Sequence, residues 1–168
     1  IGANQKGVVA VEGPLPPGCL QTVWRDDDRC VNTYWKSVPG KLVYSTFDWG
    51  VRDPDGYYTY AGRNDDMLKV SGIYVSPFEV ESTLVQHPAI LEAAVIGKVD
   101  TDGLTKTKAF IVLKAGQSVT QDEVKVFVKE RLAPYKYPRF IEFVSELPKT
   151  ATGKIQRFRL RDLDQSTH

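Results

Sequence analysis

The spacing of hydrophobic positions changes along the chain and divides the sequence into two parts. Residues 1–62 hold short apolar runs separated by glycine and proline, a pattern typical of strands and turns. The sequence GVVAVEG (7–13) predicts a strand, and GPLPPG (13–18) predicts a rigid turn that cannot lie inside a helix. The polar run DDDRCVNTYW (26–35) predicts a short helix that ends before Pro39.

Two further runs in the first part predict a β-hairpin. KLVYSTFDWGVRD (41–53) and GYYTYAGR (56–63) are rich in the β-branched and aromatic residues that strands favour. Between them lies Asp53-Pro54-Asp55-Gly56, whose residue types favour a tight turn.

After Arg63 the pattern becomes an alternation of strands and helices. Ser76, Pro77 and Glu79 suit the N-cap, first and third positions of a helix. The apolar face of that helix is expected to consist of Val80, Leu84 and Val85.

A second helix start follows at Thr120, where Glu123 completes a capping box. The apolar residues expected on this helix are Val124, Phe127, Val128 and Leu132. Strands are predicted for residues 90–98, 108–114 and 140–144, with a turn at 100–103, and a last short helix is predicted for 156–163.

The change of pattern near residues 62–66 predicts a domain boundary. Before it lies a β-rich piece, and after it a compact unit of about 100 residues, an ordinary size for a small domain. The predicted fold class is therefore α+β.

Composition narrows the range of functions. Hydrophobic residues make up 42% and charged residues 26% of the sequence, and the net charge is +1, so no overall field favours nucleic acid or a membrane surface. No apolar run approaches the roughly 20 residues that span a bilayer. Cys19 and Cys30 form no metal-binding or disulfide pattern, which favours a reducing cytoplasm. Because the chain opens at Ile1 and not at methionine, we expect a fragment or a processed product.

Two stretches before residue 73 carry candidate chemistry. Asp48 follows an apolar strand in STFDWG, where it is either a turn carboxylate or a carboxylate that accepts two ribose hydroxyls. GRNDDMLKVSG (62–72) packs charges between two glycines, which suits either a solvated linker or a hinge whose charges meet a ligand.

Near the end of the chain, Lys154 follows Gly153 in PKTATGKIQR (148–157). Taken alone, this is an ordinary solvated loop or a loop that delivers an ammonium to a phosphate. The phosphate-binding GxxxxGK[ST] pattern is absent. YKYP (135–138) suits a stiff connector, and Asp26-Asp27-Asp28 suits a solvated helix start better than a Mg²⁺ site, so no metal site is predicted.

Taken together and in order, these stretches resemble the late motifs of the adenylate-forming acyl-CoA synthetases. The carrying residues are STFDWGVRDPDGYY, GRNDDMLKVSG, YVSPFEVE, RLAPYKYPR and LPKTATGKIQR. From about Gly56 onward the chain is most similar to benzoate–CoA ligases, and before that to propionyl- and acetyl-CoA synthetases. The superfamily also contains luciferases and adenylation domains of nonribosomal peptide synthesis.

The resemblance implies a two-step reaction of a carboxylate, ATP and CoA that yields acyl-CoA, AMP and diphosphate. It implies that Asp48 holds the ribose hydroxyls, that Arg63 contacts the nucleotide and that Asp65 is the hinge. Lys154 would act on the α-phosphate in the first step. After a domain rotation, Lys69 would assist the thioester step, and Ser71 and Gly72, with Val70, would line the pantetheine channel.

Two positions depart from the family pattern. Most members have glycine before Asp48, where this chain has Phe47, as propionyl-type enzymes do. After Gly72, short-chain synthetases often have an arginine, where this chain has Ile73 and Tyr74.

The resemblance also implies that these residues are only part of the family's two-domain enzyme. Residues 1–62 would be the β-rich end of the large adenylation domain, and 63–168 the small mobile lid. The ATP loop, the acyl pocket and the glutamate that binds Mg²⁺ would lie upstream, so we expect the chain alone to be inactive. Benzoate or a related aryl acid is the first substrate expectation, and propionate or acetate the second.

Two alternatives remain open at this point. The chain could be a non-catalytic lid whose Lys154 is the target of a protein lysine acetyltransferase and a deacetylase, as the matching lysine is in bacterial relatives. It could also belong to an adenylation domain that loads a carrier protein. No nucleic-acid or membrane partner is expected.

Overall fold

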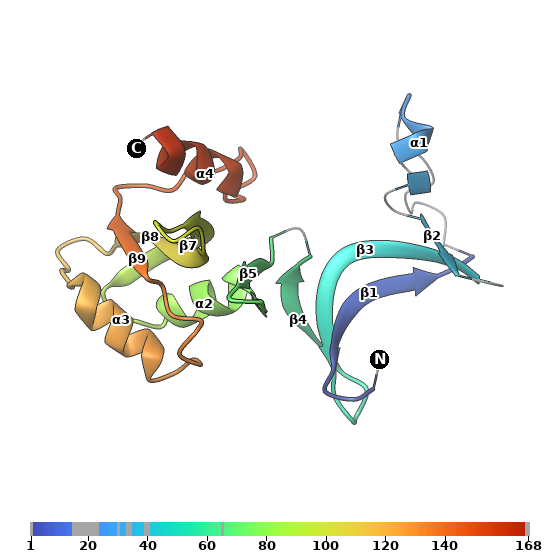
Figure 1. Ribbon diagram of the computed structural model, residues 1–168, viewed down its shortest axis with the longest axis horizontal. Coiled ribbons are helices and arrows are strands. Elements are labelled where there is room, and N and C mark those ends of the chain that lie inside the picture. The colour runs from blue at the N-terminus through green and yellow to red at the C-terminus, as the bar shows by residue number, and fades with distance from the viewer. Residues whose placement is uncertain are drawn as a thin grey trace. The chain divides into compact units, whose positions relative to one another are not determined.

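A computed structural model describes residues 2–14, 24–29, 31–32, 35–38, 41–64 and 66–166. The chain forms two compact units, Ile1–Asp65 and Asp66–His168. Figure 1 labels the elements of each unit. Among the described residues, no helix is long and apolar enough to cross a membrane.

The first unit is an antiparallel sheet built around one long central strand. Its elements are β1 (Lys6–Glu12), α1 (Asp27–Arg29), β2 (Trp35–Val38), β3 (Lys41–Arg52) and β4 (Tyr58–Arg63). β3 pairs with β1, β2 and β4, all antiparallel. The long, curved β3 lies beside β1 in Figure 1.

The predicted hairpin is present in this unit. The amide of Tyr57 donates to Oδ1 of Asp53 at 2.8 Å, and the amide of Asp53 donates to the carbonyl of Tyr57 at 3.0 Å. These bonds close the turn between β3 and β4, which is why the Asp-Pro-Asp-Gly signal was informative.

Two other predictions for the first unit fall partly on residues that the structure does not describe. The helix expected over residues 26–35 is present in part: α1 has 3 residues, Val31 and Asn32 are also helical, and residues 30, 33 and 34 lie outside the described residues. Of the residues described in this range, only Trp35, the last residue of the predicted helix, belongs to a strand, because it pairs with Tyr44 of the central strand β3. The predicted turn at 13–18 falls largely on residues 15–18, which lie outside the described residues.

The second unit is a mixed sheet with helices on both faces. Its elements are β5 (Leu68–Val70), β6 (Ile73–Val75), α2 (Pro77–Leu84), β7 (Ile90–Val99), β8 (Thr105–Leu113), α3 (Gln121–Lys129), β9 (Phe140–Phe143) and α4 (Arg157–Ser166). β7 and β8 are antiparallel neighbours, whereas β9 lies parallel to β8 after the α3 crossover. This mixture confirms the α+β prediction.

Both predicted helix starts are confirmed. The Ser76 hydroxyl accepts from the amide of Glu79 at 3.3 Å, with Pro77 in the first turn. At Thr120 the hydroxyl accepts from the amide of Glu123 at 3.2 Å, and Oε2 of Glu123 accepts from the amide of Thr120 at 2.8 Å. Each cap satisfies amides that have no partner inside the helix.

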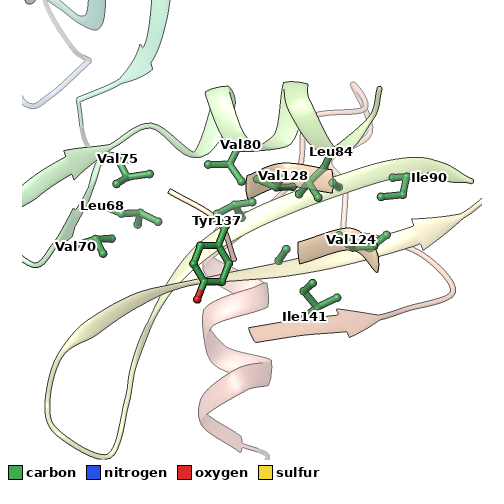
Figure 2. Packing of buried hydrophobic residues seen from close by; sticks show 14 residues of the cluster. Leu68, Val70, Val75, Val80, Leu84, Ile90, Val124, Val128, Tyr137 and Ile141 are labelled. Carbon is green, nitrogen blue, oxygen red and sulfur yellow. The ribbon is translucent and has the colours of Figure 1, made fainter. Parts of the chain in front are cut away.

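Alternate residues of β7 and β8 enter two separate cores. Ala93, Val95, Ala109 and Ile111 face α2 and α3, whereas Ala94, Ile96, Phe110 and Val112 form the other core with Leu160 of α4. Figure 2 shows the first core, with Val80 and Leu84 of α2 near Val124 and Val128 of α3. Because the side-chain period of a strand is two, burial on both faces explains the continuous apolar runs of these strands.

One predicted core residue is exposed. Val85 is 45% exposed because α2 ends at Leu84 and Val85 is its C-cap, beyond the buried face. Val80 and Leu84 are fully buried as predicted.

Candidate active site

The first candidate region is a bulge in β3 that contains Asp48. Val9 of β1 faces three residues of β3, Thr46 to Asp48, because the pairing moves from Val8↔Trp49 to Ala10↔Ser45. The Thr46 hydroxyl donates to the carbonyl of Val9 at 2.8 Å and accepts from the amide of Asp48 at 3.1 Å. Asp48 therefore lies inside β3, on a bulge held by Thr46, and not at the end of a strand as its sequence position suggested. Bulges commonly redirect side chains beside functional sites.

Strand β4 brings Arg63 to the same place. Asp48 and Arg63 are directly paired across the two strands, and Nη1 of Arg63 lies 3.6 Å from Oδ1 of Asp48. The side chains are 44% and 37% exposed for Arg63 and Asp48, respectively, so both remain accessible to a ligand. The structure thus unites two predicted nucleotide-binding residues as one solvent-facing carboxylate–guanidinium pair.

The backbone directly before Asp48 is strained at Phe47. Its φ is 61°, in the left-handed region that a bulky side chain rarely occupies. The amide of Asn64 donates to the Phe47 carbonyl at 2.7 Å, and this bond holds the strained residue against β4. Glycine adopts a positive φ without a steric cost, which is a physical reason why it suits this position. Phe47, which stands where most members of the resembled family have glycine, adopts the same conformation at a cost in strain.

The second candidate region is a tight turn that carries Lys154. Lys149 and Ile155 form an antiparallel bridge, and the amide of Thr150 donates to the carbonyl of Lys154 at 2.8 Å. The amide of Gly153 donates back to the carbonyl of Thr150 at 2.9 Å, and Gly153 has a φ of 81°. Among the described residues, the ammonium of Lys154 has no bonded partner. The loop is therefore a defined turn that presents an exposed cation.

Ion pairs anchor this turn on both sides. Lys149 lies 2.6 Å from Oε1 of Glu92 in β7. Arg157, at the start of α4, binds both carboxylate oxygens of Glu81 in α2 at 2.7 and 2.8 Å. We did not predict either contact, because the partners are far apart in sequence.

The third candidate region is the β5–β6 hairpin. Val70 pairs with Ile73, so Ser71 and Gly72 form a two-residue turn, with φ values of 49° and 83°. Two successive positive φ values are typical of a type I′ turn, in which glycine is favoured. Lys69 lies on β5 next to this turn and is exposed. The predicted channel residues are thus neighbours on one exposed turn.

The remaining predicted site residue is Asp65, which lies outside the described residues. Its neighbour Asp66 is described and contacts Arg157 and Arg161 at 3.3 Å each. Within the described part of the chain, no three His, Cys, Asp or Glu side chains gather as they would around a metal ion.

Comparison with known proteins gives a consistent family. The family model of the AMP-binding enzyme C-terminal domain matches residues 79–154. Benzoate–CoA ligase of Thauera aromatica is 53% identical over 95% of this chain, which corresponds to 29% of that protein. Propionate–CoA ligase of Escherichia coli is 42% identical over 93% of this chain and 26% of the relative. The chain therefore spans less than a third of the length of these relatives.

Solved structures agree with these relatives. The anthranilate CoA ligase AuaEII, in complex with anthranoyl-AMP, matches 97% of this chain and 31% of its own, with a TM-score of 0.83 and 46% identity. A benzoate CoA ligase from Burkholderia xenovorans LB400 matches 96% of this chain and 31% of its own, with a TM-score of 0.79 and 48% identity. Residues 79–154 are thus an AMP-binding enzyme C-terminal domain, and the chain belongs to the adenylate-forming superfamily that contains the acyl-CoA synthetases.

Proposed function

We propose that this chain is the C-terminal part of an AMP-forming carboxylate–CoA ligase. The observation that carries the proposal is the exposed ammonium of Lys154, presented on a hydrogen-bonded turn in a chain 53% identical to a benzoate–CoA ligase. The reaction would convert a carboxylate, ATP and CoA into acyl-CoA, AMP and diphosphate. In this proposal residues 1–62 complete the large adenylation domain, 63–168 form the mobile lid, and Asp65 is the hinge.

In the first step, negative charge would develop on the α-phosphate of ATP, where the Lys154 ammonium could stabilise it. A carboxylate oxygen attacks the α-phosphorus of ATP, and the bond from that phosphorus to diphosphate breaks. Lys154 would stabilise the negative charge that grows on the α-phosphate, because a compact ammonium suits a developing oxyanion. Asp48 would accept the two ribose hydroxyls, while Arg63, 3.6 Å away, holds that carboxylate and contacts the nucleotide. Mg²⁺ would be held by residues outside this chain.

The second step would use the β5–β6 turn. The CoA thiol attacks the acyl carbonyl of the adenylate, the thiol proton is lost, and the carbon–oxygen bond to AMP breaks. The turn of Ser71 and Gly72 would lie against the pantetheine arm, and exposed Lys69 would assist the attack. Glycine suits such a place because a chain of ligand atoms can approach its backbone closely.

An aryl acid is the favoured substrate. Ligases named for benzoate and for anthranilate are 46–53% identical over 95–97% of this chain. A 4-hydroxybutyrate–CoA ligase is 48% identical over 73% of it, and the propionate–CoA ligase of Escherichia coli is 42% identical over 93%. Propionate or acetate is the second candidate. We place the reaction in the cytoplasm, in keeping with the cysteine content of the chain.

ATP–diphosphate exchange by the full-length protein tests this proposal. Benzoate, anthranilate, propionate and acetate should be compared at equal concentration, with the chain alone as the control. We expect exchange that depends on an aryl acid, and none with the isolated chain. Full-length protein that exchanges with none of the four acids would contradict the proposal, and exchange by the chain alone would contradict the division into two parts.

A second proposed role concerns regulation of Lys154 by a protein acetyltransferase and deacetylase. The exposed turn makes the ammonium accessible, and acetylation would remove the charge that the first step needs. Peptide mass measurement after incubation with acetyl-CoA and such an enzyme should find the acetyl group on Lys154. A carrier-protein thiol in place of CoA is the remaining alternative, and parallel assays with both acceptors separate the two.

A further inference from the structure

Four charged side chains form one cluster at the start of the second unit. Arg157 lies 2.7 Å from Oε2 of Glu81 and 3.3 Å from Oδ2 of Asp66. Arg161, one turn further along α4, lies 3.3 Å from the other oxygen of Asp66. Two carboxylates and two guanidinium groups thus balance each other in charge.

The cluster joins three places that are distant in sequence. Asp66 is the first residue of the second unit, next to the proposed hinge position. Glu81 belongs to α2, and its Oε1 also accepts from the amide of Val95 in β7 at 2.8 Å. Arg157 begins α4, three residues after Lys154. The unit boundary and the Lys154 turn therefore share one set of contacts.

Partial burial distinguishes the Arg157–Glu81 pair from ordinary surface ion pairs. The Arg157 and Glu81 side chains are 21% and 12% exposed, whereas those of the surface pair Lys41–Glu12 are 51% and 57% exposed. Solvent and salt screen a shielded pair less. Nη2 of Arg157 contacts both oxygens of Glu81, and Nη1 contacts Asp66, so the planar guanidinium is held from two directions. The Arg157–Glu81 pair is consequently a geometric restraint.

The restraint acts on the base of the Lys154 turn. The amide of Gln156, beside Arg157, donates to the carbonyl of Pro148 at 2.8 Å and closes the end of the hairpin. On the opposite side, Lys149 and Glu92 are 38% and 34% exposed, so their pair is the less shielded anchor. Because a lysine side chain has many rotamers, the position of its ammonium depends on how firmly its own backbone is held.

We propose that Arg157 is a positioning residue for Lys154, acting through Glu81 and Asp66. It makes the Lys154 turn, α2 and the first residue after the boundary one rigid piece. In the domain rotation of the proposed function, the Lys154 ammonium would then move together with the rest of the second unit. This inference rests on the proposed function, since the role of Lys154 comes from there.

A merely structural role for Arg157 makes different predictions. If the cluster only stabilised the fold, its loss would slow both half-reactions in parallel with the fall in stability. A positioning role affects the step in which Lys154 acts and leaves the other step intact. A small misplacement of a catalytic group slows chemistry more than it weakens binding. Loss of Arg157 should therefore lower kcat of the adenylation step and leave KM for ATP unchanged.

The first experiment measures amide hydrogen exchange on the chain itself. Arg157→Lys keeps the charge but has one nitrogen in place of the two that contact Glu81 and Asp66, and Glu81→Gln removes the partner charge. Arg159→Lys, on the exposed side of the same helix, is the matched control. We expect the amides of Thr150 and Gln156 to exchange about tenfold faster in the first two variants, with the β7–β8 amides other than that of Val95 unchanged. Unchanged exchange in the turn would overturn the link between Arg157 and Lys154.

The second experiment measures both half-reactions in the full-length protein with the same variants. ATP–diphosphate exchange should fall about tenfold to a hundredfold in kcat at unchanged KM for ATP. Thioester formation from supplied acyl-adenylate should change less than about twofold. A parallel loss of both steps, or of neither, would overturn the positioning role. If the wild-type protein catalysed no ATP–diphosphate exchange, the proposed function would be refuted. The amide hydrogen-exchange result would still decide whether Arg157 holds the turn.

Discussion

The ammonium of Lys108 lies 2.6 Å from Oδ1 of Asp164, which joins strand β8 to helix α4. Lys98 of β7 approaches the same oxygen at 2.9 Å, and Glu142 of β9 lies 2.6 Å from Lys108. The Lys108 and Asp164 side chains are only 9% and 11% exposed. The three strands of the sheet and α4 are thus connected by charge as well as by the apolar contacts of Leu160.

Removal of the Asp164 carboxylate should loosen α4. Asp164→Asn leaves Lys98 and Lys108 shielded beside a neutral amide, so we expect a loss of about 2 kcal/mol in the free energy of unfolding. Asp162→Asn, on the exposed side of the same helix, should change it by less than about 0.5 kcal/mol. Urea unfolding followed by far-ultraviolet circular dichroism measures both, and equal effects of the two variants would contradict the account of α4.

The same pair predicts a dependence on pH. Burial raises the pKa of Asp164, but the hydrogen bonds and charges of Lys108 and Lys98 lower it by more, so its net pKa lies below the ordinary value. A lowered pKa in the folded state means that this stabilisation is present at neutral pH. It is lost as the pH falls from about 4 through the folded pKa.

For Lys108, burial lowers the pKa, but the hydrogen bonds and charges of Asp164 and Glu142 outweigh burial and raise it. The stabilisation from Lys108 is accordingly lost only as the pH rises above about 10.4. The difference in stability between wild type and Asp164→Asn should shrink on acidification below pH 4 or so. A constant difference between pH 7 and pH 2 would show that the carboxylate charge contributes nothing.

The left-handed backbone at Phe47 predicts that the glycine variant is more stable than the alanine variant, the reverse of the usual order in a strand. Glycine usually destabilises a strand relative to alanine, but at a φ of 61° alanine retains the strain and glycine relieves it. Phe47→Gly should therefore be more stable than Phe47→Ala by about 1 kcal/mol. At Val51, in the same strand with an ordinary φ, the alanine variant should be the more stable.

Tryptophan fluorescence is the suitable probe for this comparison. All 3 tryptophans precede residue 65, so their signal reports on the first unit alone. The same order of stability at both positions would mean that Phe47 carries no backbone strain in solution.

Alanine substitutions at two glycines can distinguish an effect of backbone strain from an effect of ligand contact. Gly72 and Gly116 have φ values of 83° and 73°, and a Cβ at either would meet no atom of the chain within 4 Å. Substitution by alanine should cost about 1 kcal/mol at each. Only Gly72→Ala should raise the KM for CoA in the full-length protein, because the added methyl group obstructs the proposed pantetheine path. Steady-state kinetics with both variants would contradict the path if they behave alike.

Local signals in the sequence were sufficient for most of the second unit. Ser76 and Thr120 marked helix starts because a cap is a contact between residues three apart. Continuous apolar runs marked β7 and β8, which are buried on both faces. Both kinds of signal depend only on neighbours in the chain.

Long-range contacts explain what the sequence did not predict. The bulge at Asp48 depends on a hydrogen bond from Thr46 to Val9, on another strand. The contacts of Arg157 with Glu81 and Asp66 join segments far apart in the chain, and no spacing rule predicts such pairs. The helix predicted for residues 26–35 does not extend to Trp35, because that residue pairs with Tyr44 of β3. The candidate residues could be named from motifs, whereas the contacts that hold them required the fold.

The most direct measurement compares Lys154→Ala and Lys69→Ala in the two half-reactions of the full-length protein. We predict that Lys154→Ala lowers carboxylate-dependent ATP–diphosphate exchange about 100-fold or more and leaves thioester formation from supplied acyl-adenylate intact. Lys69→Ala should show the reverse pattern, which makes each variant the control for the other. Loss of both half-reactions to the same extent in Lys154→Ala would contradict the role of that ammonium in the adenylation step.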